Sequence, residues 1–291
     1  MPYARHGEVE LFYTTVGRRG DPVILLISGA GRQSIDFGET FCGPLVKAGY
    51  RLIRFDSRDT GRSTGFASSS RLTAVYDAVT AGEVPPLVYG LEDLAADALA
   101  VLRAEGVDQF HIIGRSLGTS VAQALVLSEG ARVLSLSLIM AFSRSIASAV
   151  TRERMQALEG EVMADESAYV ARQVRAATLT GSPAYLDTER VAQEASEAYR
   201  RGIHPGGVAR HYAVGLAMGD LRSGLGTCSV PTLVIHGALD QVIPRTFAEE
   251  TAAAIPGARL VILADMAHDG PPELERQWTR LILNHLGHST A

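Results

Sequence analysis

The sequence is poor in lysine and in cysteine. Lys47 is the only lysine, so arginine supplies nearly all of the 27 basic residues, a bias that GC-rich coding sequence explains without any function. The two cysteines, Cys42 and Cys228, lie far apart, form no CxxC pattern and have no group of histidines beside them. Neither a disulfide framework nor a zinc site is therefore predicted, which fits an intracellular protein.

Long apolar runs and blocks of one charge are also missing. No apolar segment approaches the roughly 18 residues that cross a bilayer, and residues 1–8 contain no apolar signal core. The net charge is −5 with no basic block, so neither nucleic acid nor an anionic membrane is an expected partner. The 291 residues, 46% hydrophobic and 20% charged, predict an ordinary globular protein, which we expect in the cytoplasm.

Apolar runs typical of buried parallel strands alternate with helical patterns along most of the chain. Strands are expected at residues 23–27, 51–55, 110–113, 134–140, 231–237 and 259–263, and helices at residues 41–48, 91–103, 119–128 and 274–286. Val9 to Val16 alternates weakly and is expected to form an antiparallel edge strand. Together these patterns predict an α/β protein whose mostly parallel, twisted sheet is flanked by helices.

The alternation stops between about Phe142 and Cys228, where the sequence has a helical pattern and no convincing strand. A helical insertion between two strands of one sheet is best explained as a cap over the C-terminal edge of that sheet. We therefore expect a core domain of residues 1–141 and 229–291 and a cap, or lid, of residues 142–228. Residues 65–88 are expected to form a long loop beside the cap.

One serine lies between two glycines where an apolar run gives way to a helical pattern. Gly114-Arg115-Ser116-Leu117-Gly118 follows the run from Phe110, and helical composition begins at Thr119. A serine in a sharp strand-to-helix turn is strained, and small residues two positions before and after it let strand and helix pass closely. The turn lifts the hydroxyl above the sheet edge, near the free N–H groups of the helix N-terminus. Ser116 is therefore the candidate nucleophile.

A serine hydroxyl needs a base to activate it, and the base needs an acid to orient it. Asp240 and His268 each follow one of the last two predicted strands. Because parallel strands end on one side of a sheet, both positions open on the edge that carries Ser116. We predict Asp240 as the acid and His268 as the base. Alternatively, Asp240 only caps or braces its turn; Asp265 and Asp269 are interpreted as surface carboxylates.

An oxyanion hole needs two backbone donors. The predicted donors are the N–H groups of Leu117, which follows the nucleophile, and of Ala30, in the turn Ser28–Gly31. Backbone donation places little demand on the side chain, so leucine and alanine are acceptable there. Gly29 and Gly31 are expected to serve the tight turn.

The remaining polar candidates are expected to be structural. His236 should pack or form a hydrogen bond, and His204 and His211 could line a pocket, although structural roles are favoured for both. Asp56 to Ser63 lacks a phosphate-binding glycine pattern and partner ligands for a metal, so a turn braced by Asp–Arg hydrogen bonds is expected. No dinucleotide or Walker signature occurs, and no metal or organic cofactor is expected.

In this combination and order, the motifs resemble those of α/β-hydrolase-fold serine esterases, in which Gly-x-Ser-x-Gly is the nucleophile elbow. The resemblance runs from near the start to near the end of the chain; its motifs lie at residues 28–31, 56–63, 114–118, 236–240 and 266–268. Residues 54–64, and residues 231–235 leading to Asp240, carry a narrower resemblance to aclacinomycin methylesterase-like enzymes of actinomycete polyketide pathways. Two features depart from it: Ser28 stands where many members have histidine, and residues 65–88 are longer than expected.

The resemblance implies a hydrolase that cleaves a carboxylic ester of a hydrophobic small molecule, with a polyketide-type natural product as one candidate substrate. A second hypothesis keeps the pocket but not the hydrolysis, as in a cyclase, lyase or acyltransferase of secondary metabolism. A third is a non-catalytic receptor for a small molecule. The complete set of Ser116, Asp240 and His268 counts against a receptor, because binding alone does not need it.

Overall fold

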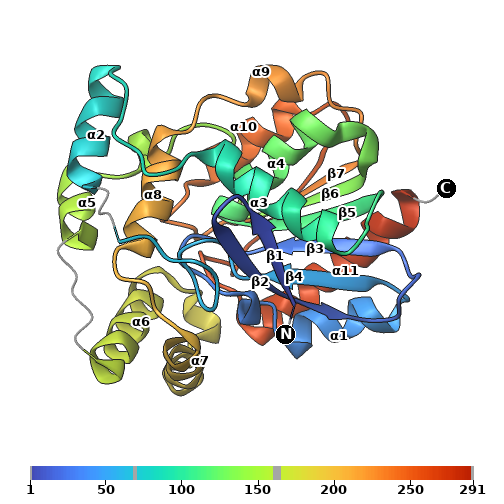
Figure 1. Cartoon of the computed structure of the whole chain (residues 1–291), viewed down its shortest axis with the longest axis horizontal. Helices are drawn as coiled ribbons and strands as arrows, with labels where there is room; N and C mark the ends of the chain where they lie inside the picture. Colours follow the sequence, from blue (N-terminus) through green and yellow to red (C-terminus); the bar gives the residue numbers. More distant parts are fainter. Residues whose placement is uncertain (1, 68–70, 160–164, 290–291) are drawn as a thin grey trace.

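Eight strands form one sheet in the computed structural model, which describes residues 2–67, 71–159 and 165–289 (Figure 1). The strand order is β1-β2-β4-β3-β5-β6-β7-β8. Strand β2 runs antiparallel to both of its neighbours, β1 and β4, and the pairs from β4 to β8 are parallel. The strands are β1 Tyr3–His6, β2 Val9–Val16, β3 Val23–Ile27, β4 Arg51–Phe55, β5 Phe110–Arg115, β6 Val133–Ile139, β7 Thr232–Gly237 and β8 Arg259–Leu263. The predicted mostly parallel sheet is therefore confirmed.

The prediction of an edge strand at Val9–Val16 is wrong. This segment is antiparallel, as expected, but β1 pairs with it on one side and β4 on the other. The four residues of β1 are too few to display a period of two, so the sequence pattern did not reveal the true edge.

The central strand β3 shows why these segments form a sheet that is covered on both faces. All five of its residues are buried and apolar. Ile24 and Leu26 pack into one hydrophobic cluster, whereas Leu25 and Ile27 pack into another. Because successive side chains of a strand point to opposite faces, a continuous apolar run needs cover on both sides.

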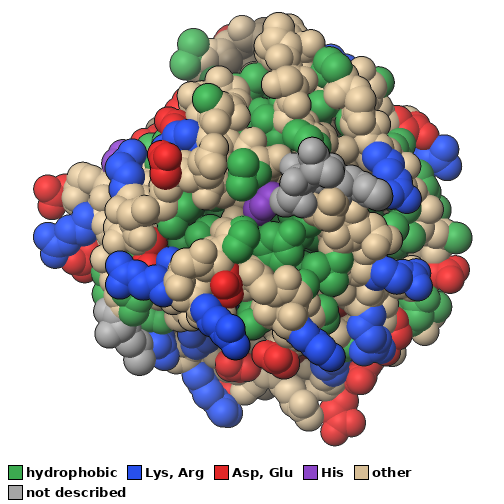
Figure 2. Space-filling model, turned by 90° about the vertical axis from the view of Figure 1, so that its right-hand side faces the viewer, with side chains coloured by type: hydrophobic (Ala, Val, Ile, Leu, Met, Phe, Trp, Pro, Cys, Tyr) green, Lys and Arg blue, Asp and Glu red, His purple; other side chains and the backbone are tan. Residues whose placement is uncertain are grey.

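Helices supply that cover (Figure 1). Helices α1 Glu39–Lys47 and α11 Pro272–Ser289 pack together on one face of the sheet, and α3 Leu91–Ala104, α4 Leu117–Glu129 and α10 Arg245–Ala254 lie on the other. Short 3₁₀ turns occupy Ser34–Asp36, Gly130–Arg132, Ala147–Ala149 and Pro183–Tyr185. No helix in the described part of the chain is long and apolar enough to cross a membrane. Acidic and basic side chains are interspersed around the face in Figure 2, with hydrophobic ones between them.

A helical insertion separates β6 from β7, as predicted. Its helices are α5 Arg152–Glu159, α6 Glu166–Thr180, α7 Thr188–Arg201, α8 Gly207–Ala217 and α9 Arg222–Leu225, and its described residues contain no strand. The domain limits at residues 142 and 228 stay predictions.

The prediction of one long loop over residues 65–88 is corrected by the structure, because a helix occupies part of this segment. Leu72–Ala81 forms helix α2, which packs against α5 and α8 of the insertion. Leu72 and Val75 are fully buried, so tertiary packing against the inserted helices stabilises a segment too short to be stable alone.

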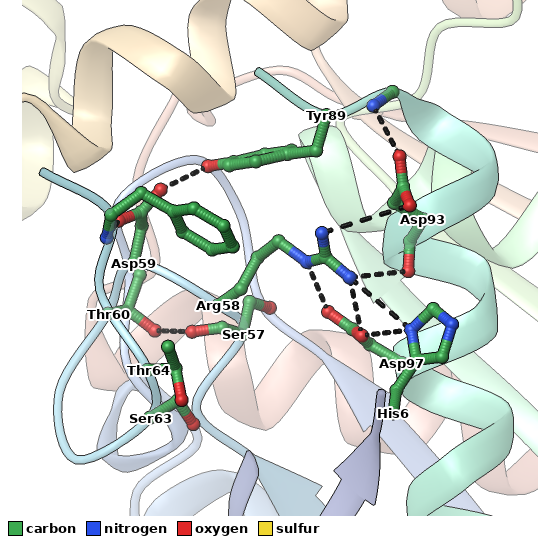
Figure 3. A network of polar contacts seen from close by, with 12 residues as sticks. His6, Ser57, Arg58, Asp59, Thr60, Ser63, Thr64, Tyr89, Asp93 and Asp97 are labelled. Atoms are coloured by element: carbon green, nitrogen blue, oxygen red, sulfur yellow. Dashed lines mark hydrogen bonds and ion pairs between the residues drawn. The ribbon is translucent and has the colours of Figure 1, made fainter. Parts of the chain in front are cut away.

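The turn after β4 joins the core to the inserted helices through buried charges. Arg210 of α8 donates hydrogen bonds from Nε to Oδ2 and from Nη2 to Oδ1 of Asp59, each 2.7 Å long. The Tyr89 hydroxyl donates to Asp59 Oδ2 as well (Figure 3), and Arg201 donates to Asp56. The predicted Asp–Arg bonds therefore exist. The Arg62 N–H donates to Asp56 Oδ2 at 3.0 Å within the turn, whereas the side-chain bonds from Arg201 and Arg210 join the turn to the insertion.

Arg58 of the same turn is directed to the core. Its guanidinium contacts Asp97 of α3 and His6 of β1, which also contact each other (Figure 3), with Nε 2.6 Å from Asp97 Oδ2. The turn is thus fixed to the core by its own Arg58 and to the insertion by two arginines, Arg201 and Arg210.

We expect Asp59→Asn to lower the free energy of unfolding by about 3–5 kcal/mol, because it leaves the buried Arg210 charge without its counter-charge. Burial would raise the pKa of Asp59, but bonds from Arg210, Tyr89 and the Phe66 N–H hold it below its ordinary 3.8. The loss should therefore persist between about pH 5 and 8 and shrink only as pH falls through the lowered pKa. Urea titrations would measure it. The control is Asp77→Asn in the half-exposed pair with Arg152, which should change little; equal losses would contradict the prediction.

Candidate active site

Ser116 lies at the end of β5 in a backbone conformation that is unusual for serine. Its φ of 50° and ψ of −121° place it in the positive-φ region, and α4 begins at the next residue. Such strain persists only where the surroundings over-determine the backbone. Here the Ser116 N–H donates to Ile139 O of β6 at 2.9 Å, and its carbonyl accepts from the Thr119 N–H at 2.8 Å.

The two glycines of the motif are required by close backbone approaches. A Cβ at Gly114 would lie 2.4 Å from Gly118 O, and a Cβ at Gly118 would lie 2.2 Å from Ile27 O at the end of β3. The strand, the helix and the loop after β3 therefore meet at van der Waals distance around Ser116. Because β4 and β5 lie on opposite sides of β3, this is also the point where the strand order reverses, the usual ligand site of an open α/β sheet.

Three residues that are distant in sequence form one chain of hydrogen bonds at this edge. His268 Nε2 lies 3.0 Å from Ser116 Oγ, and His268 Nδ1 lies 2.7 Å from Asp240 Oδ2. Asp240 follows β7 and His268 follows β8, as the sequence analysis expected. The His268 N–H donates to Thr180 O at 3.1 Å, so the end of α6 helps to hold the loop that carries the imidazole.

Asp240 is buried and ionised. Burial alone would raise its pKa, but attraction to His268 and the hydrogen bond between them, together with His236 and the Ile243 N–H, hold the pKa below its ordinary value. The N–H groups of Val242 and Ile243 both donate to Oδ1 at 2.9 Å. Oδ2 therefore remains directed at His268, with Nδ1 as the protonated ring nitrogen.

The other acidic candidates in the loop after β8 lie elsewhere. Asp265 is exposed, as expected. Asp269 is only half-buried and accepts bonds from the Ser182 N–H at 3.0 Å and the Ser182 hydroxyl at 2.5 Å, so it fixes the insertion to this loop and is not a free surface carboxylate. His236 is fully buried with Nε2 3.0 Å from Ile243 O, which fits its expected hydrogen-bonding role.

The predicted oxyanion-hole segments flank Ser116. Leu117 is the first residue of α4, and Gly29 lies so close that a Cβ there would be 3.1 Å from Ser116 Cβ. A cavity of about 10 Å³, about the room that one water molecule needs, is bounded by Gly29, Leu117, Ser57 and His211 among others. The loop after β3 and the start of α4 thus border one small space, to which α8 contributes His211.

Sequence reasoning did not assign a role to Arg115, the residue before Ser116. Its guanidinium lies over the rings of Phe37 and Trp278, 5.5 and 5.1 Å from their centroids, and 3.3 Å from Asp36. A Cβ at Gly270 would be 2.2 Å from Arg115 Nη2. Arg115 therefore packs against the loop that carries His268. Its role depends on partners that are distant in sequence, so the local motif around Ser116 could not predict it.

No group of three or more His, Cys, Asp or Glu side chains among the described residues could hold a metal ion. Cys42 and Cys228 are both buried and free.

Comparisons with known proteins show similarity along nearly the whole chain. Rhodomycin D methylesterase DnrP of Streptomyces peucetius is 28% identical over 301 residues, covering 96% of this chain and 95% of that protein. The putative carbamate hydrolase RutD of Variovorax paradoxus is 28% identical over 283 residues, covering 97% of each. The enol-lactonase of Burkholderia xenovorans LB400 has the same fold, with a TM-score of 0.77 at 24% identity over 98% of this chain and 100% of the other.

A family model described as alpha/beta hydrolase fold matches residues 22–288, which is nearly the whole chain. The match includes the strand-to-helix turn at Ser116 and the loops that carry Asp240 and His268. The chain belongs to the α/β-hydrolase fold family.

Proposed function

We propose that this hydrolase is a serine esterase that cleaves a carboxylic ester of a hydrophobic small molecule through an acyl-enzyme. The observation that carries the proposal is the unbroken hydrogen-bond chain from Ser116 Oγ through His268 to the buried carboxylate of Asp240. A serine, a base within reach of it and an acid that orients the base are the parts that nucleophilic acyl transfer requires.

In the first half-reaction, Ser116 Oγ attacks the ester carbonyl carbon while His268 Nε2 accepts the hydroxyl proton. A tetrahedral adduct forms, and Asp240 stabilises the resulting imidazolium without taking its proton. His268 then returns the proton to the departing alkoxide as the ester C–O bond breaks. An alcohol leaves, and the acyl group stays on Ser116.

The adduct carries a negative oxygen, for which we propose the backbone N–H groups of Ala30 and Leu117 as donors. Removing one such donor costs a serine hydrolase about 10²–10³ in rate. Gly29, Gly114 and Gly118 allow the backbone segments to approach closely enough for this arrangement.

In the second half-reaction, water replaces the alcohol. His268 Nε2 accepts a proton from water as its oxygen attacks the acyl carbon, and then gives this proton to Ser116 Oγ as the acyl–serine bond breaks. The carboxylic acid leaves, the serine hydroxyl is restored, and no metal or organic cofactor takes part.

The substrate class is inferred from the surroundings of the site and from the relatives. Leu179, at the end of α6, precedes the residue whose carbonyl holds His268, and Leu239 precedes Asp240; their side chains are 76% and 45% exposed. Exposed apolar side chains next in sequence to Thr180 and Asp240 favour a hydrophobic ester. Two relatives that span the chain are rhodomycin D methylesterases, so we propose a methyl ester of a polyketide-type molecule.

Selectivity is assigned to the proposed cap, residues 142–228, together with α2. The core, residues 1–141 and 229–291, carries Ser116, Asp240 and His268, whereas the proposed cap supplies Leu179.

We expect Ser116→Ala to lower kcat for p-nitrophenyl butyrate by a factor on the order of 10⁶, because the nucleophile is lost. Alanine fits the turn sterically, so the thermal unfolding midpoint should stay close to that of the unchanged protein. Retention of more than about a tenth of the activity would exclude Ser116 as the nucleophile. An inactive unchanged protein would speak against an esterase and for a non-hydrolytic enzyme or a receptor.

We expect Asp240→Asn to lower kcat by up to about 10⁴ with little change in shape, because an amide favours the wrong histidine tautomer. Asp269→Asn is the matched control, since Asp269 lies in the loop of His268 and also accepts two hydrogen bonds but does not contact the imidazole. Steady-state kinetics on both variants would decide the assignment. A greater loss in Asp269→Asn would place the acid there instead.

We expect Leu179→Ala to lower kcat/KM for p-nitrophenyl benzoate about tenfold more than for p-nitrophenyl acetate, because a bulky acyl group loses apolar contact that a small one never makes. Leu127→Ala is the control: this leucine is 42% exposed but lies near the far end of α4, about 16 Å along the helix from Ser116. An equal loss for both esters would indicate a structural role, and the assignment of selectivity to Leu179 would have to be withdrawn.

A further inference from the structure

The loop after β3, residues 28–33, is held in place by the inserted helices. The Gly31 N–H donates to His211 Nδ1 of α8 at 2.9 Å. Two residues on, the Gln33 side-chain amide donates to Ala198 O and Gly202 O at 2.8 and 3.0 Å, at the end of α7. Within the loop, the Ser28 hydroxyl donates to Gln33 O at 3.2 Å, and directly after it the Ser34 N–H donates to Asp56 Oδ1 of the core at 2.8 Å.

Both ring nitrogens of His211 are hydrogen-bonded to the backbone. Nδ1 accepts from Gly31, and Nε2 lies 2.9 Å from Arg58 O in the turn after β4, so Nε2 carries the proton. The side chain is 1% exposed. Burial lowers the pKa of His211 to about 4, against the opposing effects of Asp59 and of the bond to Arg58, so the ring is neutral at physiological pH and Nδ1 keeps its lone pair.

Neighbouring residues of α8 fix the imidazole against the core. Arg210 makes the two buried bonds to Asp59, and a Cβ at Gly207 would lie 2.5 Å from Asp59 O. Val208 lies against Gly31, where a Cβ would meet Val208 Cγ2 at 2.5 Å, and Gly31 has a φ of +68° that favours glycine. The helix therefore contacts Gly31 through two side chains one turn apart.

Holding Gly31 has a consequence for the residue before it. The Gly31 N–H and the Ala30 carbonyl belong to one planar peptide unit, so a hydrogen bond that fixes this unit also limits the rotation of Ala30. The Ala30 N–H is the oxyanion donor assigned to this loop under the proposed function. The small cavity that borders Leu117, the other proposed donor, is bounded by His211 as well.

We propose that His211 is a positioning residue for ester hydrolysis: by accepting the Gly31 N–H, it orients the loop that supplies the oxyanion donor Ala30. This inference rests on the proposed esterase function. It makes α8 part of the catalytic apparatus, because a shift of this helix moves the loop, and it gives the inserted helices a role in rate as well as in selectivity.

Two amide variants separate the two ring nitrogens. His211→Asn places an oxygen where Nδ1 was and keeps an acceptor for Gly31, whereas His211→Gln places an amide nitrogen near Nε2 and keeps only the donor to Arg58. Each loses one hydrogen bond to the backbone, so both should lower the unfolding midpoint. Only the glutamine variant should lose a large part of kcat.

We expect His211→Gln to lower kcat for p-nitrophenyl butyrate on the order of 10- to 100-fold with KM little changed, because the hole acts on the transition state and not on the bound ester. His211→Asn should recover most of this loss. The matched control is His204→Gln: His204 also lies in the insertion, and its Nε2 is 3.1 Å from Gly61 O of the turn after β4, but it does not contact the loop of Gly31. Its kcat should not change.

The kcat values and the unfolding midpoints of the three variants test whether His211 positions the loop after β3. The positioning role would be overturned if His211→Asn and His211→Gln had equal kcat, if kcat fell in step with the unfolding midpoint, or if His204→Gln lost as much kcat as His211→Gln. Each of these results would leave the esterase proposal intact. If the unchanged protein does not hydrolyse the ester and Ser116 does not react with diisopropyl fluorophosphate, the proposed function fails, and the role of His211 fails with it.

Discussion

The close approach of three backbone segments at Ser116 is the constraint on which the rest of the site depends. Strand β5, helix α4 and the end of β3 meet where Gly114 and Gly118 leave no room for a Cβ, and Ser116 accepts a positive φ of 50° as a result. This strain is stable only because the sheet on either side is fully packed. The same approach places the loop after β3 next to the hydroxyl, so one packing arrangement positions both the proposed nucleophile and the loop of the proposed oxyanion donor Ala30.

Buried charge pairs join the inserted helices to the core domain. Asp59 with Arg210, and Asp56 with Arg201, join the turn after β4 to α8 and to the end of α7. Such pairs add little net stability, because desolvation offsets most of their attraction, but they penalise any arrangement that separates them. They therefore act mainly as geometric constraints. An insertion joined to the core by apolar contact alone could slide, whereas this one is held in register with the loop after β3.

Local patterns predicted the parallel strands because each contains a short run rich in apolar residues, and they predicted the loops of Asp240 and His268 because parallel strands end on one side of a sheet. The structure brings these two side chains and Ser116 into hydrogen-bond contact; their catalytic roles stay predictions. Three features could not be read from local patterns. Strand β1 is too short to show a period, α2 is stabilised by helices far away in sequence, and the partners of Asp56 and Asp59 lie about 145 and 151 positions downstream.

Two of these features, helix α2 and the partners of Asp56 and Asp59, share a physical origin, because both depend on how the insertion packs on the core. A motif records what neighbouring residues need from each other, such as glycines around a strained serine. It does not record that the Gly31 N–H donates to His211, because the two residues are distant in sequence and meet only when α8 packs on the loop after β3. Under the proposed function, chemistry and selectivity are therefore not divided cleanly between core and insertion. A substitution that moves α8 acts on the pocket wall and on the loop after β3 together, so rate and substrate preference are coupled through one helix.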